Sequence, residues 1–429
     1  MPVNRNKVAM GISGGVDSAV AALLLMEQGY DVTAVHLYCW PPKSEIEKDH
    51  MTREAWIKKN GCRADEDRGF ALKTALELGI PFKVLDFSEE YNSKVINYFY
   101  DEYEAGRTPN PDVMCNSEIK FGLFLKWALE NGFDYIATGH YAKLISDTDN
   151  SSYDHIPLLA TDNLSLPASD NYLDSRLEFP PMAGPSNSSL RSVAQRNVAQ
   201  RSNLYRLMIP EDKHKDQTYF LWKLTQKELA HVLFPLGDLE KNEVRKLAEK
   251  ANLGVAKRKD SQGICFVGNI EAREFLARRL KENPGKVLDM QGEEIGKHDG
   301  VWFYTIGQRG GWEITPDAQR KFAENGVTPV FYVVGKDAKK NILTVGEEKE
   351  AAGDQFEVGS LNKISDTKWN MDDLIVRIRH GGELIGARGM KTDDGLMIIL
   401  DKSIRGIASG QSAVFYTENG ECLGGGVIS

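Results

Sequence analysis

The sequence predicts an α/β fold in which an N-terminal doubly wound parallel sheet is followed by a small, mainly helical central domain and a C-terminal β-barrel. Strand-like apolar runs alternate with helix-length segments in the first third of the chain. From about Gly285 onward, short apolar runs are separated by Gly, Asp and Asn. The alternation is typical of a parallel sheet with helices on both faces, whose ligands bind at the carboxyl ends of its strands. Short, closely spaced strands are typical of a small barrel or two.

The N-terminal elements follow in order. Residues 7–12 predict a buried strand, residues 13–17 a glycine turn, and residues 18–28 a helix that ends at Gly29. The pattern continues, less regularly, with strands expected at 31–37, 82–86 and 135–138 and helices at 65–78 and 119–131.

Residues 145–203 interrupt this pattern. They include 11 Ser and 6 Asn and no Lys, Trp or Cys. Such a segment has too little periodic apolar surface to offset the entropy of ordering it, so we expect an inserted, largely mobile surface segment.

The later elements change in character. Residues 225–252 carry apolar stripes of helical spacing, which predicts the helical central part. The strand-like runs of the last part lie at 330–334, 374–378, 397–400 and 412–416. We expect domain boundaries that divide the chain into 1–228, 229–285 and 286–429.

Composition excludes several classes of protein. The chain has 429 residues, 41% of them apolar, and a net charge of −9, which is typical of a globular protein and not of a disordered one. The apolar run at 19–26 is far shorter than the roughly 20 residues of a membrane helix. No secretory signal or transit peptide is apparent at the N-terminus, so we expect a cytoplasmic location and no membrane partner.

The cysteines and the local charge carry further information. Five cysteines without a CxxC pair argue against a disulfide framework and a zinc ribbon. Residues 206–259 hold 12 Lys or Arg against 8 Asp or Glu, a local excess of positive charge in an acidic chain. On charge alone a solvated helical face is the preferred explanation, and a polyanion site is the alternative.

A glycine loop lies between the first strand and the first helix, where backbone N–H groups and the helix dipole favour an anion. It lacks the terminal Lys of the GxxxxGK[ST] loop and does not match GxGxxG. A purely structural glycine turn is the alternative. The sequence SGGVDS resembles the pyrophosphate loop (PP-loop) of ATP pyrophosphatases, which cleave ATP between the α and β phosphates. The loop residues are Gly11, Ile12, Ser13, Gly14, Gly15, Val16, Asp17 and Ser18.

Two cysteines lie in contexts suited to chemistry. Cys115 follows two prolines and precedes a helix expected to start near Glu118, a position that favours the thiolate. Cys265 follows a cluster of cationic residues and lies between glycines. For either cysteine alone, a small buried apolar role is the alternative. We expect Cys39, Cys62 and Cys422 to be structural or surface residues.

Six sequence blocks together resemble the tRNA-specific 2-thiouridylase family over nearly the whole chain except 145–203. The blocks are TPNPDVMCNSEIKFG, ATGHYAK, HKDQTYFLW, LFPLGDLEKNEVRKLA, KDSQGICFVG and TIGQRGG. The resemblance implies an adenine nucleotide hydrolase-like domain at 1–228, a tRNA-binding domain at 229–285 and a barrel at 286–429. It also implies that ATP and Mg²⁺ activate the 2-oxygen of the wobble uridine (position 34), and that a cysteine desulfurase or relay protein supplies persulfide sulfur.

The resemblance assigns roles to individual residues. Cys265 matches the persulfide-bearing cysteine, and Cys115 matches the catalytic cysteine that removes the terminal sulfur or resolves the adduct. Asp17 helps to organise Mg²⁺ with the phosphates, whereas the sequence alone shows no metal site. Leu37 and Gly139 match nucleotide contacts, although the family usually has Met at the position of Leu37.

Further matches concern the target base and tRNA. Asn110, Pro111 and Asp112 match the segment that meets the base. The implied tRNA contacts are His140, Lys215, Asp216, Gln217, Arg379, His380 and Gln411. His380 departs from the Arg-Tyr pair of the family, but it can still stack on a base or bind phosphate.

Two other hypotheses remain. An amide- or amidine-forming ligase shares the loop but uses an amine nucleophile and would not need the cysteines. A tRNA-binding module without catalysis is the second, and the intact loop and cysteine blocks argue against it.

Overall fold

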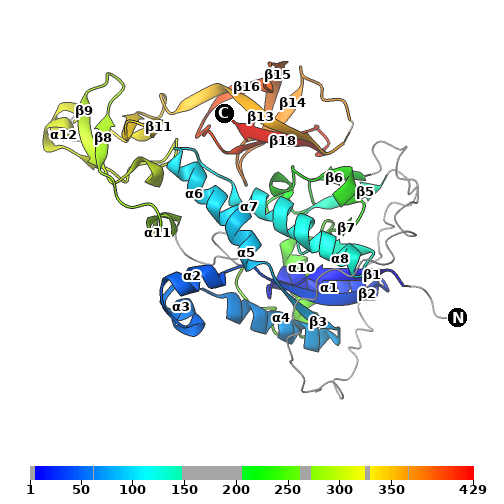
Figure 1. Cartoon of the computed structure of the whole chain (residues 1–429). Coiled ribbons are helices and arrows are strands. Elements are labelled where there is room, and N and C mark those ends of the chain that lie inside the picture. The colour runs from blue at the N-terminus through cyan, green and yellow to red at the C-terminus, as the bar shows by residue number, and fades with distance from the viewer. Residues whose placement is uncertain (1–4, 61, 147–204, 261–271, 324–328, 366) are drawn as a thin grey trace.

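The computed structural model describes residues 5–60, 62–146, 205–260, 272–323, 329–365 and 367–429. Figure 1 shows the parallel sheet and its helices at the bottom, with a mixed sheet at the top left and a barrel at the top right. Helices α6 and α7 lie between these parts (Figure 1). The expected α/β architecture with a C-terminal barrel is therefore confirmed.

The N-terminal sheet is parallel throughout, and its first strands match the expected ones closely. Within the described residues, its strand order is β3 (Phe82–Asp86), β2 (Asp31–Tyr38), β1 (Lys7–Gly11), β4 (Tyr135–Ala137) and β7 (Val232–Leu233). The register pairs Met10 with Ala34 on one side and with Ala137 on the other. The loops that follow β1 and β4 therefore emerge side by side at the carboxyl edge.

Helices cover both faces of this sheet. Helix α1 buries most of its length, from Val16 to Leu25, which explains its apolar sequence. The helices up to β4 are α1 (Val16–Glu27), α2 (Lys43–Lys48), α3 (Arg53–Asn60), α4 (Ala64–Leu78), α5 (Ser88–Tyr91), the π-helical η1 (Asn92–Ile96), α6 (Asn97–Glu104), α7 (Pro111–Met114), the π-helical η2 (Cys115–Phe124) and α8 (Leu125–Glu130).

The segment expected to be helical at 225–252 is interrupted by a strand. It contains the short helix α9 (Gln226–Leu229), strand β7 and helix α10 (Lys241–Lys250). The break follows from Pro235 and Gly237, which disfavour a continuous helix. Helix α10 packs against α1. The other elements between β4 and the mixed sheet are β5 (Lys143–Ser146), β6 (Tyr205–Met208), the 3₁₀ turn η4 (Thr218–Phe220) and α11 (Ala272–Ala277).

The predicted insertion leaves and re-enters the fold at one place. Strands β5 and β6 pair antiparallel, with Ser146 opposite Tyr205. Residues 147–204 lie outside the described residues, so the expectation of a mobile segment remains a prediction. The first two residues assigned to it, Ile145 and Ser146, belong to β5.

The C-terminal β region consists of two units. In the described part of the chain, the first is a mixed sheet in the order β10-β9-β8-β12-β11, and the second is a closed barrel in the order β13-β16-β15-β14-β17-β18. The mixed unit contains β8 (Gly285–Leu288), β9 (Glu294–His298), η5 (Val301–Phe303), β10 (Glu313–Ile314), α12 (Pro316–Phe322), β11 (Tyr332–Asp337) and β12 (Ile342–Gly346). The barrel strands are β13 (Ala352–Lys363), β14 (Leu374–Arg377), β15 (Ile385–Lys391), β16 (Leu396–Arg405), β17 (Ser412–Tyr416) and β18 (Cys422–Ile428).

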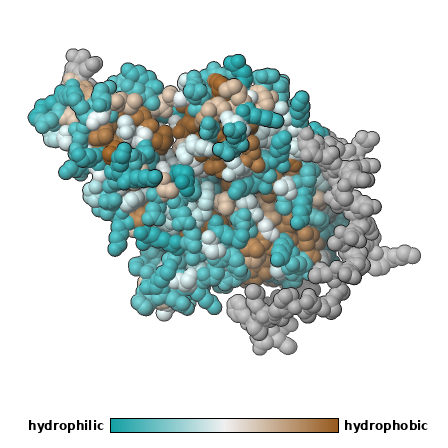
Figure 2. All heavy atoms as spheres, turned by 45° about the horizontal axis from the view of Figure 1, so that its top comes forward, coloured by the Kyte–Doolittle hydropathy of each residue, from teal (hydrophilic) through white to brown (hydrophobic). Residues whose placement is uncertain are grey.

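The core and the surface agree with this arrangement. The barrel has an apolar core of its own, whereas its buried residues Val414, Tyr416 and Cys422 belong to a core shared with the N-terminal part and the mixed sheet. Figure 2 shows mostly hydrophilic residues around the rim of the visible face, with hydrophobic residues in several separate groups. None of the helices in the described ranges is long and apolar enough to cross a membrane. The domain boundaries at 228 and 285 remain predictions.

Candidate active site

The glycine loop connects β1 to α1 at the carboxyl edge of the parallel sheet. Gly14 has a φ of +82°, and a Cβ there would lie 2.4 Å from the carbonyl oxygen of Asp67. Only glycine fits this position. The hydroxyl oxygens of Ser13 and Ser18 lie 3.1 Å apart, and the Ser13 backbone N–H donates to Ser18 Oγ at 3.2 Å. The predicted loop residues thus form a compact turn over the start of a 12-residue helix, which suits an anion.

Gly139 lies directly against this turn. It follows β4, and a Cβ at Gly139 would lie 2.7 Å from the backbone nitrogen of Ser18 and 2.9 Å from the carbonyl carbon of Asp17. The two predicted nucleotide-contacting segments are therefore in van der Waals contact. Leu37 is buried on the neighbouring strand β2. The ring nitrogen Nδ1 of the preceding His36 lies 3.0 Å from the carbonyl oxygen of Ile12, which ties β2 to the loop.

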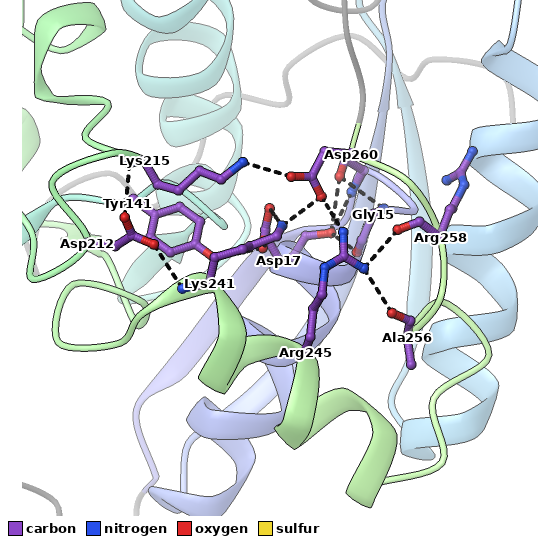
Figure 3. Close-up of polar contacts among 12 residues, drawn as sticks. Gly15, Asp17, Tyr141, Asp212, Lys215, Lys241, Arg245, Ala256, Arg258 and Asp260 are labelled. Carbon is purple, nitrogen blue, oxygen red and sulfur yellow. Dashed lines mark hydrogen bonds and ion pairs between the residues drawn. The ribbon is translucent and has the colours of Figure 1, made fainter. Parts of the chain in front are cut away.

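Asp17 is held by residues that sequence reasoning missed. Lys241 Nζ donates to both carboxylate oxygens of Asp17, at 2.7 and 2.8 Å, and the Tyr141 hydroxyl donates to Oδ1 at 2.9 Å. Burial and the nearby Asp17 carboxylate raise the pKa of Tyr141, so its hydroxyl stays protonated and remains a donor. Figure 3 shows Asp17, Lys241 and Arg245 converging beside Gly15.

A second carboxylate, Asp260, completes this cluster. It accepts from Lys241 Nζ, Arg245 Nη2 and Lys215 Nζ, each at 2.8 Å. Burial raises the pKa of Asp260, but the hydrogen bonds from Lys215 and Lys241 outweigh it and lower the pKa to about 2. Asp260 is therefore ionised at neutral pH.

Arg258 fastens the same segment to the loop. Its guanidinium donates to the Gly14 carbonyl oxygen and to the carboxylate of Asp67 near the start of α4. Arg245 in turn donates to the carbonyl oxygens of Ala256 and Arg258, at 3.0 and 3.1 Å. Residues 256–260, which lead to the segment with Cys265, are thus held beside the glycine loop. Cys265 itself lies outside the described residues.

The helix that carries Cys115 begins earlier than predicted. Helix α7 starts at Pro111, and the Asn110 side chain caps it by accepting from the Val113 N–H at 3.3 Å. Proline at the first helical position and asparagine at the N-cap explain this start, so the expected start near Glu118 is wrong. Cys115 is the first residue of η2 and is fully buried. Within a helix, π-helical turns occur frequently at functional sites.

His140 connects the Cys115 helix to the glycine loop. Its Nδ1 lies 2.8 Å from Thr138 Oγ1, and its Nε2 lies 3.5 Å from Lys120 Nζ on η2. The ring also packs against Phe121, with centroids 5.7 Å apart. Burial and the nearby Lys120 ammonium lower the pKa of His140 well below its usual value, so the ring is neutral. His140 follows Gly139, so one turn of chain touches both the loop and the helix.

The segment before Cys115 joins the N-terminal part to both β units. The backbone N–H of Thr108 donates to the Ser409 carbonyl oxygen at 2.8 Å, and Gln411 Nε2 donates to the carbonyl oxygens of Thr108 and Pro109 at 3.3 and 3.4 Å. Thr108 Oγ1 also lies 3.4 Å from Thr305 Oγ1 of the mixed unit. The Gln411 amide therefore faces the protein backbone immediately before the predicted base segment Asn110–Asp112.

Asp216 has a different environment from the other predicted tRNA contacts. It is 2% exposed, accepts from Arg377 Nη1 at 2.5 Å, and also accepts from the Thr218 N–H at 2.9 Å. The Tyr219 hydroxyl donates to the Ser412 carbonyl oxygen at 3.0 Å across the same boundary. A buried ion pair thus joins this segment to the barrel.

The remaining predicted contacts separate into two groups. Gln217 accepts from the Tyr141 N–H at 2.8 Å, and Lys215 is paired with Asp260, so both belong to the loop cluster. Arg379 and His380 are exposed on the barrel, and the His380 ring lies 4.4 Å from the Phe220 ring.

A metal site made by protein residues alone is absent from the described ranges, which contain no group of three His, Cys, Asp or Glu side chains placed to hold an ion. Mg²⁺ usually takes one or two carboxylates and completes its shell with phosphates and water. The single carboxylate of Asp17 at the glycine loop fits that requirement.

Family models match nearly the whole chain. Residues 6–162 and 192–269 match a tRNA methyl transferase HUP domain, and residues 273–347 match a tRNA methyl transferase PRC-barrel domain. Residues 354–428 match an aminomethyltransferase beta-barrel domain. The HUP match omits 163–191, inside the predicted insertion.

Curated relatives align over the full length. The tRNA-specific 2-thiouridylase MnmA of Lactococcus lactis subsp. cremoris is 37% identical, covering 99% of this chain and 95% of that protein. The same enzyme of Bacillus cytotoxicus is 36% identical with the same coverage. A solved structure of NMN synthetase from Francisella tularensis shows only low similarity, with a TM-score of 0.27 and 12% identity over 60% of this chain and 66% of that one.

Proposed function

The chain belongs to the tRNA-specific 2-thiouridylase family, and from this premise we propose how its described residues convert a wobble uridine of tRNA to 2-thiouridine. The alignments with the curated relatives support the activity itself, since they cover 99% of this chain and 95% of each relative. The structural observation that supports the mechanism is the turn at Gly139 and His140, which touches both the phosphate loop and the Cys115 helix. Nucleotide chemistry and thiol chemistry can therefore act on one bound base.

The first step is adenylation of the base. The 2-oxygen of uridine is a poor leaving group, so it attacks the α-phosphorus of ATP and pyrophosphate departs. Backbone N–H groups at the start of α1 stabilise the negative charge on the phosphates. Asp17, whose carboxylate accepts from Lys241, would hold Mg²⁺, which would neutralise further phosphate charge.

The second step is sulfur transfer. A persulfide on Cys265, supplied by a cysteine desulfurase or a relay protein, provides the sulfur that bonds to C2 of the base, and AMP leaves with the former 2-oxygen. Cys115 attacks the sulfur of Cys265 and forms a disulfide, which releases the terminal sulfur to the base. A reductant of the dithiol class must later restore both thiols. The buried position of Cys115 supports a thiol that is shielded from solvent until the substrate is bound.

The tRNA contacts divide between the barrel and the base segment. Arg379 and His380 are exposed and suited to phosphate binding or base stacking. Asn110, Pro111 and Asp112 lie at the start of the Cys115 helix, where they can border the target base. Gln411 supports this segment through its backbone rather than reaching outward.

ATP cleavage that depends on tRNA tests this function. We expect pyrophosphate release only when a tRNA with a wobble uridine is present, measured with a coupled phosphate assay and limiting enzyme. Release driven by a small amine in place of tRNA would instead support the ligase hypothesis and contradict the proposal.

Replacing Gly139 with alanine should disable the nucleotide site. The added Cβ would meet the α1 backbone at 2.7 Å, and backbone atoms cannot move aside as a flexible side chain does. We expect an overpacking cost of roughly 1–3 kcal/mol and ATP binding at least about tenfold weaker, measured by titration calorimetry.

Gly69→Ala is the matched control for this variant. Gly69 lies inside α4, and a Cβ there meets no atom within 4 Å. We expect unchanged ATP binding and slightly higher stability, since alanine is the better helix former. Equal ATP affinity in both variants would show that the Gly139 contact does not support the loop.

A further inference from the structure

The carboxylate of Asp260 is surrounded by positive charge. Among the described residues, Lys215, Lys241 and Arg245 each donate to it at 2.8 Å, and its side chain is one-third exposed. Exposed ion pairs contribute little to the stability of the folded protein. Folding stability therefore does not explain why three cationic side chains surround one carboxylate. The arrangement is that of a cationic site filled by a side chain of the protein itself.

The three cations are positioned before any ligand arrives. Lys241 and Arg245 are four residues apart and so share one face of α10. Asp212 accepts from the backbone N–H of Lys241 at 2.9 Å and from that of Lys215 at 3.2 Å. This carboxylate therefore fixes the two segments that carry the cations relative to each other, which lowers the cost of binding an anion between them.

The cluster lies where phosphate charge must be neutralised. Figure 3 shows Lys241, Arg245 and Asp260 beside Gly15 of the glycine loop. That loop lacks the lysine with which the GxxxxGK[ST] loop holds the β and γ phosphates. Another segment must then supply the cations, and Lys241 already contacts Asp17 of the loop. Guanidinium and ammonium groups are the side chains that bind phosphate best.

We propose that Lys215, Lys241 and Arg245 form the subsite for the pyrophosphate portion of ATP, and that Asp260 is an internal counter-ion displaced from this subsite by the phosphates. The inference rests on the proposed function, because it takes ATP as the nucleotide. With Asp17 counted, the subsite holds three positive charges against two carboxylates. An incoming polyphosphate competes with Asp260 for all three cations.

Removing the internal competitor should strengthen anion binding. We expect Asp260→Asn to bind inorganic pyrophosphate about tenfold more tightly than the wild-type protein, measured by titration calorimetry without ATP or tRNA. The matched control is Asp238→Asn, which removes the same charge from an exposed pair with Lys143 and should leave the affinity unchanged. Equal or weaker binding by Asp260→Asn would overturn the proposal.

Replacing Lys215 is a second test. Its side chain is 40% exposed, so we expect the substitution to leave the fold intact. We expect Lys215→Met to bind pyrophosphate about tenfold more weakly and Lys215→Arg to restore the affinity. If Lys215→Met weakens only tRNA binding and leaves the pyrophosphate affinity unchanged, Lys215 is a tRNA contact and the subsite assignment is wrong.

The pyrophosphate subsite and the thiolation activity are tested by different measurements. Normal formation of 2-thiouridine together with an unchanged pyrophosphate affinity in both variants would refute the subsite alone. If the wild-type protein forms no 2-thiouridine but the two variants show the expected changes in pyrophosphate affinity, the proposed function is refuted and the polyphosphate site remains.

Discussion

Replacing Cys115 with alanine is expected to lower the rate of 2-thiouridine formation by roughly 10³-fold or more. In the proposed mechanism the Cys115 thiol attacks the sulfur of Cys265, and a methyl group cannot do so. Pyrophosphate release in the first turnover should persist, because the phosphate loop is untouched. Nucleoside mass spectrometry and a pyrophosphate assay on the same sample separate the two steps.

Cys422→Ala is the matched control. Cys422 is also fully buried, in barrel strand β18, and burial raises the pKa of its thiol, so that it stays protonated. Each variant loses one thiol sulfur from a packed interior, so a general packing defect would appear in both. Comparable loss of 2-thiouridine in the two variants, or full activity of Cys115→Ala, would contradict the catalytic role of Cys115.

Replacing Asp216 with asparagine is expected to destabilise the protein by about 3–5 kcal/mol. The substitution leaves the Arg377 guanidinium buried, 7% exposed, without its carboxylate partner. Chemical denaturation monitored by tryptophan fluorescence measures the change. Asp238→Asn breaks an exposed pair and should cost less than about 1 kcal/mol.

The same variant decides between two roles for Asp216. The family resemblance implies a tRNA contact, whereas the structure places the side chain in a buried pair with the barrel. Weaker tRNA binding at unchanged stability would support the first role. Loss of stability in the absence of tRNA supports the second.

Much of the parallel sheet could be predicted from local sequence. The strand predicted at 82–86 matches β3, and that at 31–37 differs from β2 by one residue. Strand β2 is largely buried and rich in apolar residues, which gives a strong signal. Strand β3 is a mostly exposed edge strand and is marked instead by Gly79 and Pro81 before it. The two-residue strand β7 has no such signal, because a run of that length is recognisable only from its partner β4.

The parts of the site formed by glycines and main-chain turns can be predicted from the sequence. The ion pairs between side chains far apart in the sequence cannot. The glycine loop and Gly139 were identified from sequence, and the structure places them in contact. Lys241 and Asp17 are 224 residues apart, and nothing local distinguishes Lys241 from a surface lysine of an amphipathic helix. Its only sequence signal was membership, with Arg245, in the LEKNEVRKLA block.

A single-turnover assay of the wild-type protein tests whether thiolation of the wobble uridine depends on ATP. Unmodified tRNA with uridine at the wobble position is incubated with ATP, Mg²⁺ and a persulfide donor, beside the same tRNA with cytidine there. We predict one 2-thiouridine and one AMP per turnover with the uridine tRNA, and neither product with the cytidine tRNA or without ATP. Thiolated nucleoside formed without ATP, or AMP formed without thiolated nucleoside, would contradict ATP-dependent thiolation of the wobble uridine.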